Sequence, residues 1–291
     1  MSKVLKNPYG LRHGVLVTAD CVERGLACGC TCPECGERLI ANHGTVVKQR
    51  YFSHESGAEC EAAYETALHM LAKEVLAEQR RILLPPLSLS VTRQLMQEAR
   101  QKLQTLRSRL VAIPAEITDP ISPTAQVVRT GHYQQFDQVD VEVHLKEVIP
   151  DVVMRVAGRK LLVEIFVTHA VTDAKMRWLE ENSLPMIEFN FSAADRTIGK
   201  DDLKRAFLQP RRPLGNGNSK WVHHPKAKKE QNRLDDEFRA TYLDRLDALV
   251  KASDPQARAA CEHDQVAVVG VDGVRRSMCR KCWKFFGRLP G

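Results

Sequence analysis

The sequence predicts a mixed α/β fold, in which a mixed sheet is flanked by helices and a small cysteine-rich module lies at each end. Apolar residues first recur at helical spacing, and from about residue 126 they alternate as in strands. Of the nine cysteines, six fall within 21–60 and three within 261–282. Helices and strands that succeed one another along the chain are typical of a layered α/β domain.

Two helices are expected before the strands. Residues 64–81 combine strong helix formers with apolar residues at helical spacing, and Pro85-Pro86 then prevents any continuation. Residues 91–112 have the pattern of a second, basic amphipathic helix. We identify no internal repeat in the chain.

The middle of the chain is expected to form a sheet. Residues 138–145 alternate, and 149–167 read as two strands joined by the tight turn "AGRK". A helix over 172–183, a strand over 185–192 and a helical stretch within 193–208 complete the core.

The remaining chain is expected to form a linker and an appended module. Residues 209–233 are rich in Pro, Gly, Asn and Lys without apolar periodicity, which predicts a basic flexible linker. A charged helix over 234–252 then leads to the last cysteines. We therefore expect four parts: an N-terminal metal-binding module (1–62), a core domain (63–208), the linker (209–233) and a C-terminal module (234–291).

The charge is unevenly distributed. Residues 1–208 hold 26 Lys/Arg and 26 Asp/Glu, whereas 209–291 hold 17 and 10, so the net charge of +7 lies in the C-terminal part. Such an excess favours a polyanion such as nucleic acid, and a solvated basic tail is the alternative. The start lacks an apolar run and no stretch approaches 18 apolar residues, so we expect a cytoplasmic protein with no membrane partner.

The N-terminal cysteines have the spacing of a zinc site. Cys32, Cys35, His54 and Cys60 supply a tetrahedral set with a "CPEC" knuckle. Cys28 and Cys30 compete as ligands. The alternative is a group of buried free thiols.

A second set lies near the C-terminus. It consists of Cys261, His263, Cys279 and Cys282, and a solvated His263 with water as the fourth ligand is the alternative. Aromatic and basic residues interleave beside the second knuckle and suit either nucleic-acid binding or a small core: Arg280, Lys281, Trp283, Lys284, Phe285 and Phe286. We expect structural zinc in both modules.

The hairpin brings two carboxylates together. A turn centred on Gly158 pairs residues whose numbers sum to about 315, which places Asp151 opposite Glu164 on one face. Such a pair can hold Mg²⁺ or Mn²⁺ near a phosphodiester. Two solvent-facing strand-end carboxylates are the alternative, but Glu164 lies in an apolar run and needs a partner. Strand alternation places Phe166 on the same face of the strand as Glu164.

The first helix carries a further polar stripe. Glu65, His69 and Lys73 recur every four residues and share one helix face. They suit a metal carboxylate, a proton-transfer group and a phosphate-binding cation. An ordinary solvent-facing stripe is the alternative.

Three blocks together resemble the competence CoiA-like family. They are "CPEC…RYFSH…C", "YETALHMLAK" and "IPDVVM…LLVEIFVTHAV…MIEFNFS", and the resemblance covers about residues 28–192. It implies a PD-(D/E)XK nuclease-like core behind a zinc module. It also implies zinc on the first Cys/His set and Mg²⁺ on Asp151 and Glu164, with Glu65 assisting.

The resemblance has one departure. Phe166 stands where this fold usually places its lysine, and Lys175, then Lys73, are the candidates to replace that cation. We therefore expect a metal-dependent nuclease that acts on DNA rather than RNA, in DNA uptake or anti-phage defence. The alternative is a non-catalytic adaptor that binds DNA or a protein partner, the latter through its C-terminal module.

Overall fold

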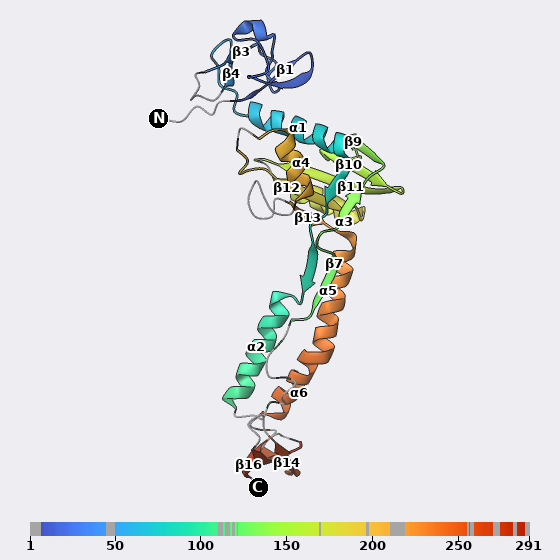
Figure 1. Ribbon diagram of the computed structural model, residues 1–291. Coiled ribbons are helices and arrows are strands. Elements are labelled where there is room, and N and C mark those ends of the chain that lie inside the picture. Colours follow the sequence, from blue (N-terminus) through green and yellow to red (C-terminus); the bar gives the residue numbers. More distant parts are fainter. Residues whose placement is uncertain are drawn as a thin grey trace. The chain divides into compact units, whose positions relative to one another are not determined.

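The fold is described from a computed structural model. The described residues are 7–44, 50–109, 113, 117, 120, 122–168, 170–195, 198–209, 219–254, 256, 259–269, 274–281 and 284–288. The chain divides into two compact units, and Figure 1 traces the elements of both. The first unit contains Met1–Leu87 and Val128–Pro225, and the second contains Ser88–Val127 and Lys226–Gly291.

A five-stranded mixed sheet lies at the centre of the first unit. Its strand order is β13-β12-β11-β10-β9. The strands are β9 (Gln138–Val141), β10 (Val152–Val156), β11 (Arg159–Phe166), β12 (Met186–Asn190) and β13 (Ser219–His223). Strands β11 and β12 are parallel and the other neighbours are antiparallel. The expected α/β fold class with a mixed sheet is therefore confirmed.

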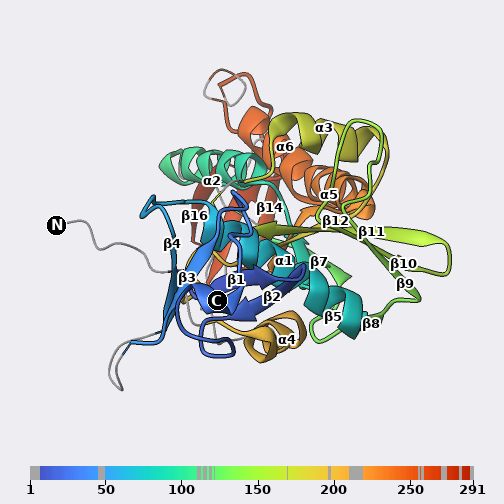
Figure 2. The same cartoon turned by 90° about the horizontal axis from the view of Figure 1, so that it is seen from above.

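Helices cover both faces of this sheet. Helices α1 (Ala63–Gln79) and α4 (Lys200–Leu208) share a core with Val152 and Val163, while α3 (Asp173–Glu181) packs on Val153 and Leu162 of the opposite face. Figure 2 shows α3 on one side of the sheet and α4 on the other. Burial on both faces explains why β11 reads as a nearly continuous apolar run. Helix α3 also supplies the crossover that two parallel strands require.

Part of the expected linker belongs to this sheet. Strand β13 pairs with β12, and the indole of Trp221 donates to the Pro85 carbonyl at 2.7 Å and packs against the core. The helix that follows begins at Pro225, within the same range. The composition of this range did not predict these elements, because they are stabilised by contacts with segments distant in the sequence. Residues 210–218 lie outside the described residues.

A small module formed by short strands precedes α1. It contains β1 (Tyr9–Arg12), β2 (Val15–Thr18), the 3₁₀ turn η1 (Leu26–Cys28), β3 (Leu39–Asn42) and β4 (Tyr51–His54). The Tyr9 hydroxyl donates to the Ile198 carbonyl, and the Tyr64 hydroxyl donates to the Asp195 carbonyl at 3.0 Å. These two bonds attach the module and the start of α1 to the loop before α4. Strands β5 (Arg81–Leu83) and β8 (Tyr133–Gln135) pair after α1.

The second unit is built on helices. Helix α2 (Arg93–Ser108) packs beside α6 (Asp244–Ala252), which continues α5 (Pro225–Phe238) through a π-helical turn, η3 (Arg239–Leu243). Strand β6 (Leu87–Ser90) pairs with β7 (Thr124–Val128). A three-stranded sheet of β14 (Gln265–Val269), β15 (Arg275–Cys279) and β16 (Phe285–Arg288) forms the C-terminal module.

These units differ from the expected domain boundaries. We placed the second helix in the core domain, but the apolar face of α2 packs on α6, more than a hundred residues further along the chain. An amphipathic stripe shows that a helix must be covered and does not identify its partner. Among the described residues, no helix has the length and apolar character that a membrane crossing requires.

Candidate functional site

The hairpin register brings Asp151, the residue before β10, close to Glu164 within β11. Val152 pairs with Val163 and Val156 with Arg159, so paired residue numbers sum to 315 as the sequence predicted. Asp151 directly precedes the first pair and Glu164 directly follows it. The turn residues Ala157 and Gly158 both have positive φ, which matches the twist of a two-residue hairpin. The expected register is confirmed.

Asp151 is held as a carboxylate. Its Oδ2 accepts from the Ile165 amide at 2.8 Å, and its Oδ1 lies 3.2 Å from His69 Nδ1 and 3.0 Å from Lys73 Nζ. Burial opposes ionisation, but the hydrogen bonds from His69 and the Ile165 amide and the charge of Lys73 outweigh it and lower the pKa of Asp151 to about 2. The residue therefore supplies a fixed negative charge.

Glu164 has one close cation. Its Oε2 accepts from Lys175 Nζ at 2.6 Å, and both side chains are largely buried. Burial raises the pKa of Glu164, the charge of Asp151 adds to the increase, and the bond to Lys175 only partly offsets it. Lys175 reaches the site from the first turn of α3, where Thr172 caps the helix by accepting from the Lys175 amide. A lysine from the next helix thus stands beside Glu164, whereas the strand residue two positions after Glu164 is Phe166.

The polar stripe of α1 faces the hairpin rather than open solvent. Lys73 Nζ bonds to Asp151 and, at 2.8 Å, to Glu142 Oε1. Burial favours the neutral amine of Lys73, but these two acidic partners outweigh it and raise its pKa. The alternative of a solvent-facing stripe therefore does not hold for Lys73 and His69.

The two ring nitrogens of His69 have different surroundings. Its Nδ1 lies against Asp151, and its Nε2 is buried without a hydrogen-bond partner among the described residues. Glu65 Oε1 is 4.0 Å from that Nε2, while Glu65 Oε2 accepts from Thr168 Oγ1 at 2.6 Å. A carboxylate on one ring nitrogen fixes the tautomer and leaves the other nitrogen as the acceptor.

Sequence reasoning missed two members of this site. Glu142 N donates to the Asp151 carbonyl, and in the parallel pair Glu188 lies directly beside Glu164. Glu188 is only 3% exposed and pairs with Lys220 Nζ at 2.9 Å. An acid within the apolar run "MIEFNF" was an available signal, because a buried carboxylate requires a partner. Lys220 was not considered because it lies in the range 209–233, which was assigned to the linker.

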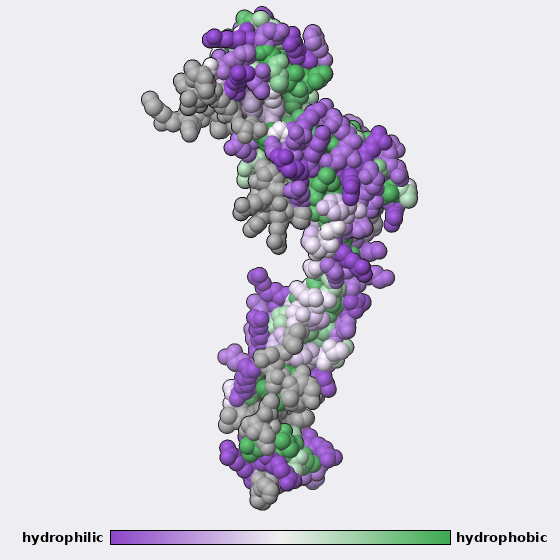
Figure 3. All heavy atoms as spheres, in the orientation of Figure 1, coloured by the Kyte–Doolittle hydropathy of each residue, from purple (hydrophilic) through white to green (hydrophobic). Residues whose placement is uncertain are grey.

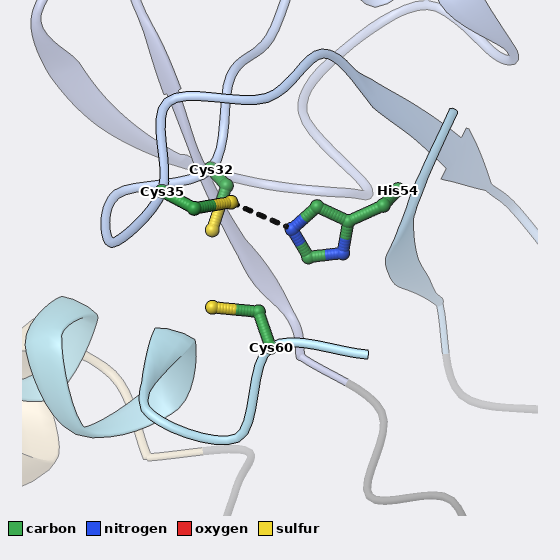
Figure 4. Close-up of side chains that lie close together, drawn as sticks. All are labelled: Cys32, Cys35, His54 and Cys60. Carbon is green, nitrogen blue, oxygen red and sulfur yellow. Dashed lines mark hydrogen bonds between the residues drawn. The ribbon is translucent and has the colours of Figure 1, made fainter. Parts of the chain in front are cut away.

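The N-terminal cysteine set converges as expected. The ligand atoms of Cys32, Cys35, His54 and Cys60 all lie within 4.8 Å of one another, with Cys35 Sγ 3.3 Å from His54 Nε2. Figure 4 shows the three sulfurs and the imidazole pointing toward one another. His54 ends β4, and Cys60 precedes α1 by three residues. Two thiolates from a knuckle, a third thiolate and an imidazole form a set that can hold zinc.

Cys28 and Cys30 do not join this set. The Cys28 thiol donates to the Leu39 carbonyl at 3.2 Å, and the Cys30 thiol donates to the Cys28 carbonyl at 3.4 Å. Both are buried in the core of the module, and burial, followed by the Cys28 contact, raises the pKa of Cys30 to about 12. These two residues therefore act as small apolar side chains.

The C-terminal set also converges. Ligand atoms of Cys261, His263 and Cys279 lie within 4.8 Å of one another, and the two sulfurs are 3.7 Å apart. The fourth expected ligand, Cys282, lies outside the described residues, as does Trp283. Within the described chain, only these two Cys/His sets bring three or more candidate ligands of this type so close together. The carboxylates around Asp151 do not converge to the same degree.

Comparisons with known proteins identify no relative. No protein-family model matches the chain, and no curated protein or solved structure matches it.

Proposed function

We propose that this chain is a metal-dependent nuclease that acts on DNA, with a core of the PD-(D/E)XK type as in competence CoiA-like proteins. The observation that carries the proposal is that Asp151 and Glu164 lie next to the outermost hairpin pair, Val152–Val163, with the ammonium of Lys175 at 2.6 Å from Glu164. This arrangement combines two carboxylates and a cation, which suit metal-dependent phosphodiester cleavage. DNA uptake and anti-phage defence both suit such an activity.

Asp151 and Glu164 are the residues that would hold Mg²⁺ or Mn²⁺. Two neighbouring, largely buried carboxylates need compensating positive charge, and oxygen ligands suit these ions. The bound ion would supply Lewis-acid activation of water and of the phosphodiester. Glu65 completes the acidic set from α1, although its carboxylate bonds to Thr168 in this structure.

The other polar residues have separate roles in this proposal. His69 Nε2 accepts a proton from the attacking water, because Nδ1 is engaged by Asp151. Lys175 holds a positive charge beside Glu164, and the flexible lysine stem allows the ammonium to move onto a phosphate oxygen. Lys73 stabilises the charged form of Asp151.

The two Cys/His sets would hold structural zinc. In the first unit Cys60 O accepts from the Ala63 amide, and Thr66 of α1 donates to Glu34 of the knuckle. The N-terminal zinc would therefore fix the start of the helix that carries Glu65, His69 and Lys73. The C-terminal zinc would organise the basic module that contacts DNA.

One observation favours a second function, a non-catalytic adaptor that binds DNA or protein. Asp151 and Glu164 each already have a lysine partner, so the charges of the pair are compensated within the chain. With Phe166 on the lysine face of β11, a degenerate core of this kind would keep its fold without metal. The adaptor would then act through its zinc modules.

Metal titration distinguishes these functions. Single- and double-stranded DNA are incubated with wild type, Glu164→Gln and Glu180→Gln while Mg²⁺ or Mn²⁺ is varied. Glu180 is an exposed glutamate of α3 and serves as the matched control. The nuclease predicts divalent-dependent cleavage that Glu164→Gln abolishes and Glu180→Gln retains. If cleavage is absent, or survives Glu164→Gln, the adaptor is the better description.

A further inference from the structure

Three cysteine sulfurs of the N-terminal module lie close enough to react with one another. The Sγ atoms of Cys32, Cys35 and Cys60 all lie within 4.8 Å of one another, and Figure 4 shows them pointing toward the same point. The sulfurs of a disulfide lie about 2 Å apart, so an approach of less than about 3 Å brings any two of them to that distance. The set that can hold zinc is therefore also placed to form a disulfide.

These three thiols differ in their exposure to solvent. Cys32 is 1% exposed and lies in the core of the module, whereas Cys35 is exposed and Cys60 is half-buried. Figure 3 shows hydrophilic side chains, in purple, over much of the visible surface of this module. A small polar oxidant therefore reaches Cys35 first, and Cys60 is the more accessible of the two sulfurs beside it.

The other cysteines of the module are not placed for this reaction. The thiols of Cys28 and Cys30 are buried and donate to backbone carbonyls. Cys21 is exposed but belongs to neither of the converging Cys/His sets. Cys21 thus offers a control for the effect of exposure alone.

Both the knuckle and Cys60 contact the start of α1. The Ala63 amide donates to the Cys60 carbonyl at 3.2 Å, so Cys60 directly precedes the first turn of the helix. Thr66 Oγ1 donates to the carboxylate of Glu34, which lies between the two cysteines of the knuckle. A rearrangement of the cysteines therefore acts on the first two turns of α1.

Helix α1 in turn contacts the carboxylate pair. His69 Nδ1 and Lys73 Nζ lie 3.2 Å and 3.0 Å from Asp151 Oδ1. A displacement of about 1 Å in catalytic geometry can lower a rate by about a hundredfold. The state of the cysteines can therefore control a site to which they contribute no side chain.

We propose that Cys35 and Cys60 form a reversible oxidation site, in which hydrogen peroxide converts the two thiolates into a disulfide, releases the zinc and lowers nuclease activity. The effect on cleavage rests on the proposed function. The chemistry of the cysteines does not, because it requires only their reactive form and their proximity. Zinc binding keeps ligand cysteines as thiolates, which are the nucleophilic form.

The reaction balances in two steps. The Cys35 thiolate attacks one oxygen of hydrogen peroxide, the O–O bond breaks, hydroxide leaves and Cys35 becomes a sulfenic acid. The Cys60 thiolate then attacks the Cys35 sulfur, so that an S–S bond forms, the S–O bond breaks and a second hydroxide leaves. Two protons convert the hydroxides to water, and the two sulfurs supply the two electrons. Only Cys32 and His54 then remain of the set, which is too few ligands for a structural zinc.

Peptide mapping of the full-length protein identifies the product. Protein treated with graded hydrogen peroxide is alkylated and digested with trypsin, which places Cys35 in peptide 25–38 and Cys60 in peptide 51–73. A Cys35–Cys60 disulfide joins these peptides, whereas a disulfide between Cys32 and Cys35 stays inside 25–38, and fragmentation spectra assign each sulfur. A link between peptides 259–275 and 277–280 reports oxidation of the C-terminal set separately. Cys21→Ser, which removes the exposed thiol outside the set, is the matched control.

Three readouts accompany the mapping. A chromophoric chelator measures released zinc, amide hydrogen exchange follows α1 with α2 as the internal reference, and DNA cleavage is assayed with Mg²⁺. We expect the joined peptides to appear together with the loss of about one zinc ion per chain. Exchange across the start of α1 should become faster, and cleavage should fall by roughly a hundredfold. Dithiothreitol with added zinc should reverse these changes, and Cys21→Ser should behave as wild type.

Several results would overturn the inference. They are the absence of a disulfide in this set, a disulfide inside 25–38, a link to Cys60 that starts from Cys32, and cleavage that stays constant while the joined peptides accumulate. The proposed function fails separately, through reduced protein that does not cleave DNA. In that case the mapping and the exchange of α1 still decide whether Cys35 and Cys60 form an oxidation site coupled to the helix.

Discussion

Replacement of Lys175 by methionine removes the ammonium that stands 2.6 Å from Glu164 and 3.3 Å from the Ile149 carbonyl. Methionine keeps much of the length of the side chain and its apolar stem. The Glu164 carboxylate then remains largely buried without its cation. We therefore expect Lys175→Met to destabilise the protein in the absence of divalent metal.

The magnitude follows from the partial exposure of the pair. Removal of one partner from a fully buried ion pair costs about 3–5 kcal/mol. Here the side chains of Lys175 and Glu164 are 14% and 20% exposed, so water can reach the remaining carboxylate. Because water screens this pair, we expect a smaller loss of unfolding free energy, about 1–3 kcal/mol, which is the cost of an unsatisfied buried polar group.

A double-mutant cycle isolates this contact. Urea denaturation of wild type, Lys175→Met, Glu164→Gln and the double variant gives the coupling energy of the pair, which should be about 1–2 kcal/mol. Arg177→Met, at an exposed position of α3, is the matched control and should couple to Glu164→Gln by less than about 0.5 kcal/mol. Mg²⁺ should stabilise Lys175→Met more than wild type, because the ion replaces the lost cation.

Two results would refute this reasoning. A cost of Lys175→Met that is the same with glutamate or glutamine at 164 would show that the ion pair contributes nothing measurable. An absence of any Mg²⁺-dependent stabilisation in Lys175→Met would show that the carboxylates do not bind the ion.

Three further predictions concern other parts of the chain. Cys60→Ser should lower the zinc content by about one ion per chain and destabilise the N-terminal module, because structural zinc contributes folding energy. Elemental analysis measures the zinc content and thermal melting measures the stability. An unchanged zinc content would contradict the prediction. Residues 261–291 hold six Lys/Arg and three Asp/Glu. Their deletion should reduce the slope of log affinity for DNA against log salt concentration, while α2 and α6 stay folded. An unchanged slope would show that this module does not contact DNA. Tyr9→Phe should cost about 1–3 kcal/mol in urea denaturation, because the Ile198 carbonyl loses its buried donor; a change near zero would mean that another donor replaces it.

Local patterns in the sequence determined much of the fold. The period of 3.6 placed α1 and α2, and the apolar runs on each side of "AGRK" predicted β10, β11 and the register that places Asp151 close to Glu164. The knuckle spacing identified the four residues that converge around Cys35. These features depend on residues a few positions apart or on the geometry of one turn, and both kinds of information can be read from the sequence.

Contacts between distant segments were decided only by the tertiary structure. The parallel pairing of β11 and β12 places Glu188 beside Glu164, and β13 then brings Lys220 to Glu188. The composition of 209–233 indicated a linker, and strand β13 within it was missed. Its residues form a strand because they pair with β12, and their own strand propensity does not predict it. The sequence placed Lys175 before Lys73 as the replacement cation, and in the structure each lysine pairs with a different carboxylate.

The same distinction applies to α2. Its sequence showed an apolar face and a charged face, but only the packing on α6 reveals which arginines stay exposed. Amphipathicity requires that one face be buried, and the long-range fold selects the surface that buries it. The sequence alone therefore determined the helices α1 and α2 and the local hairpin geometry, while the tertiary structure determined which charges meet and which face solvent.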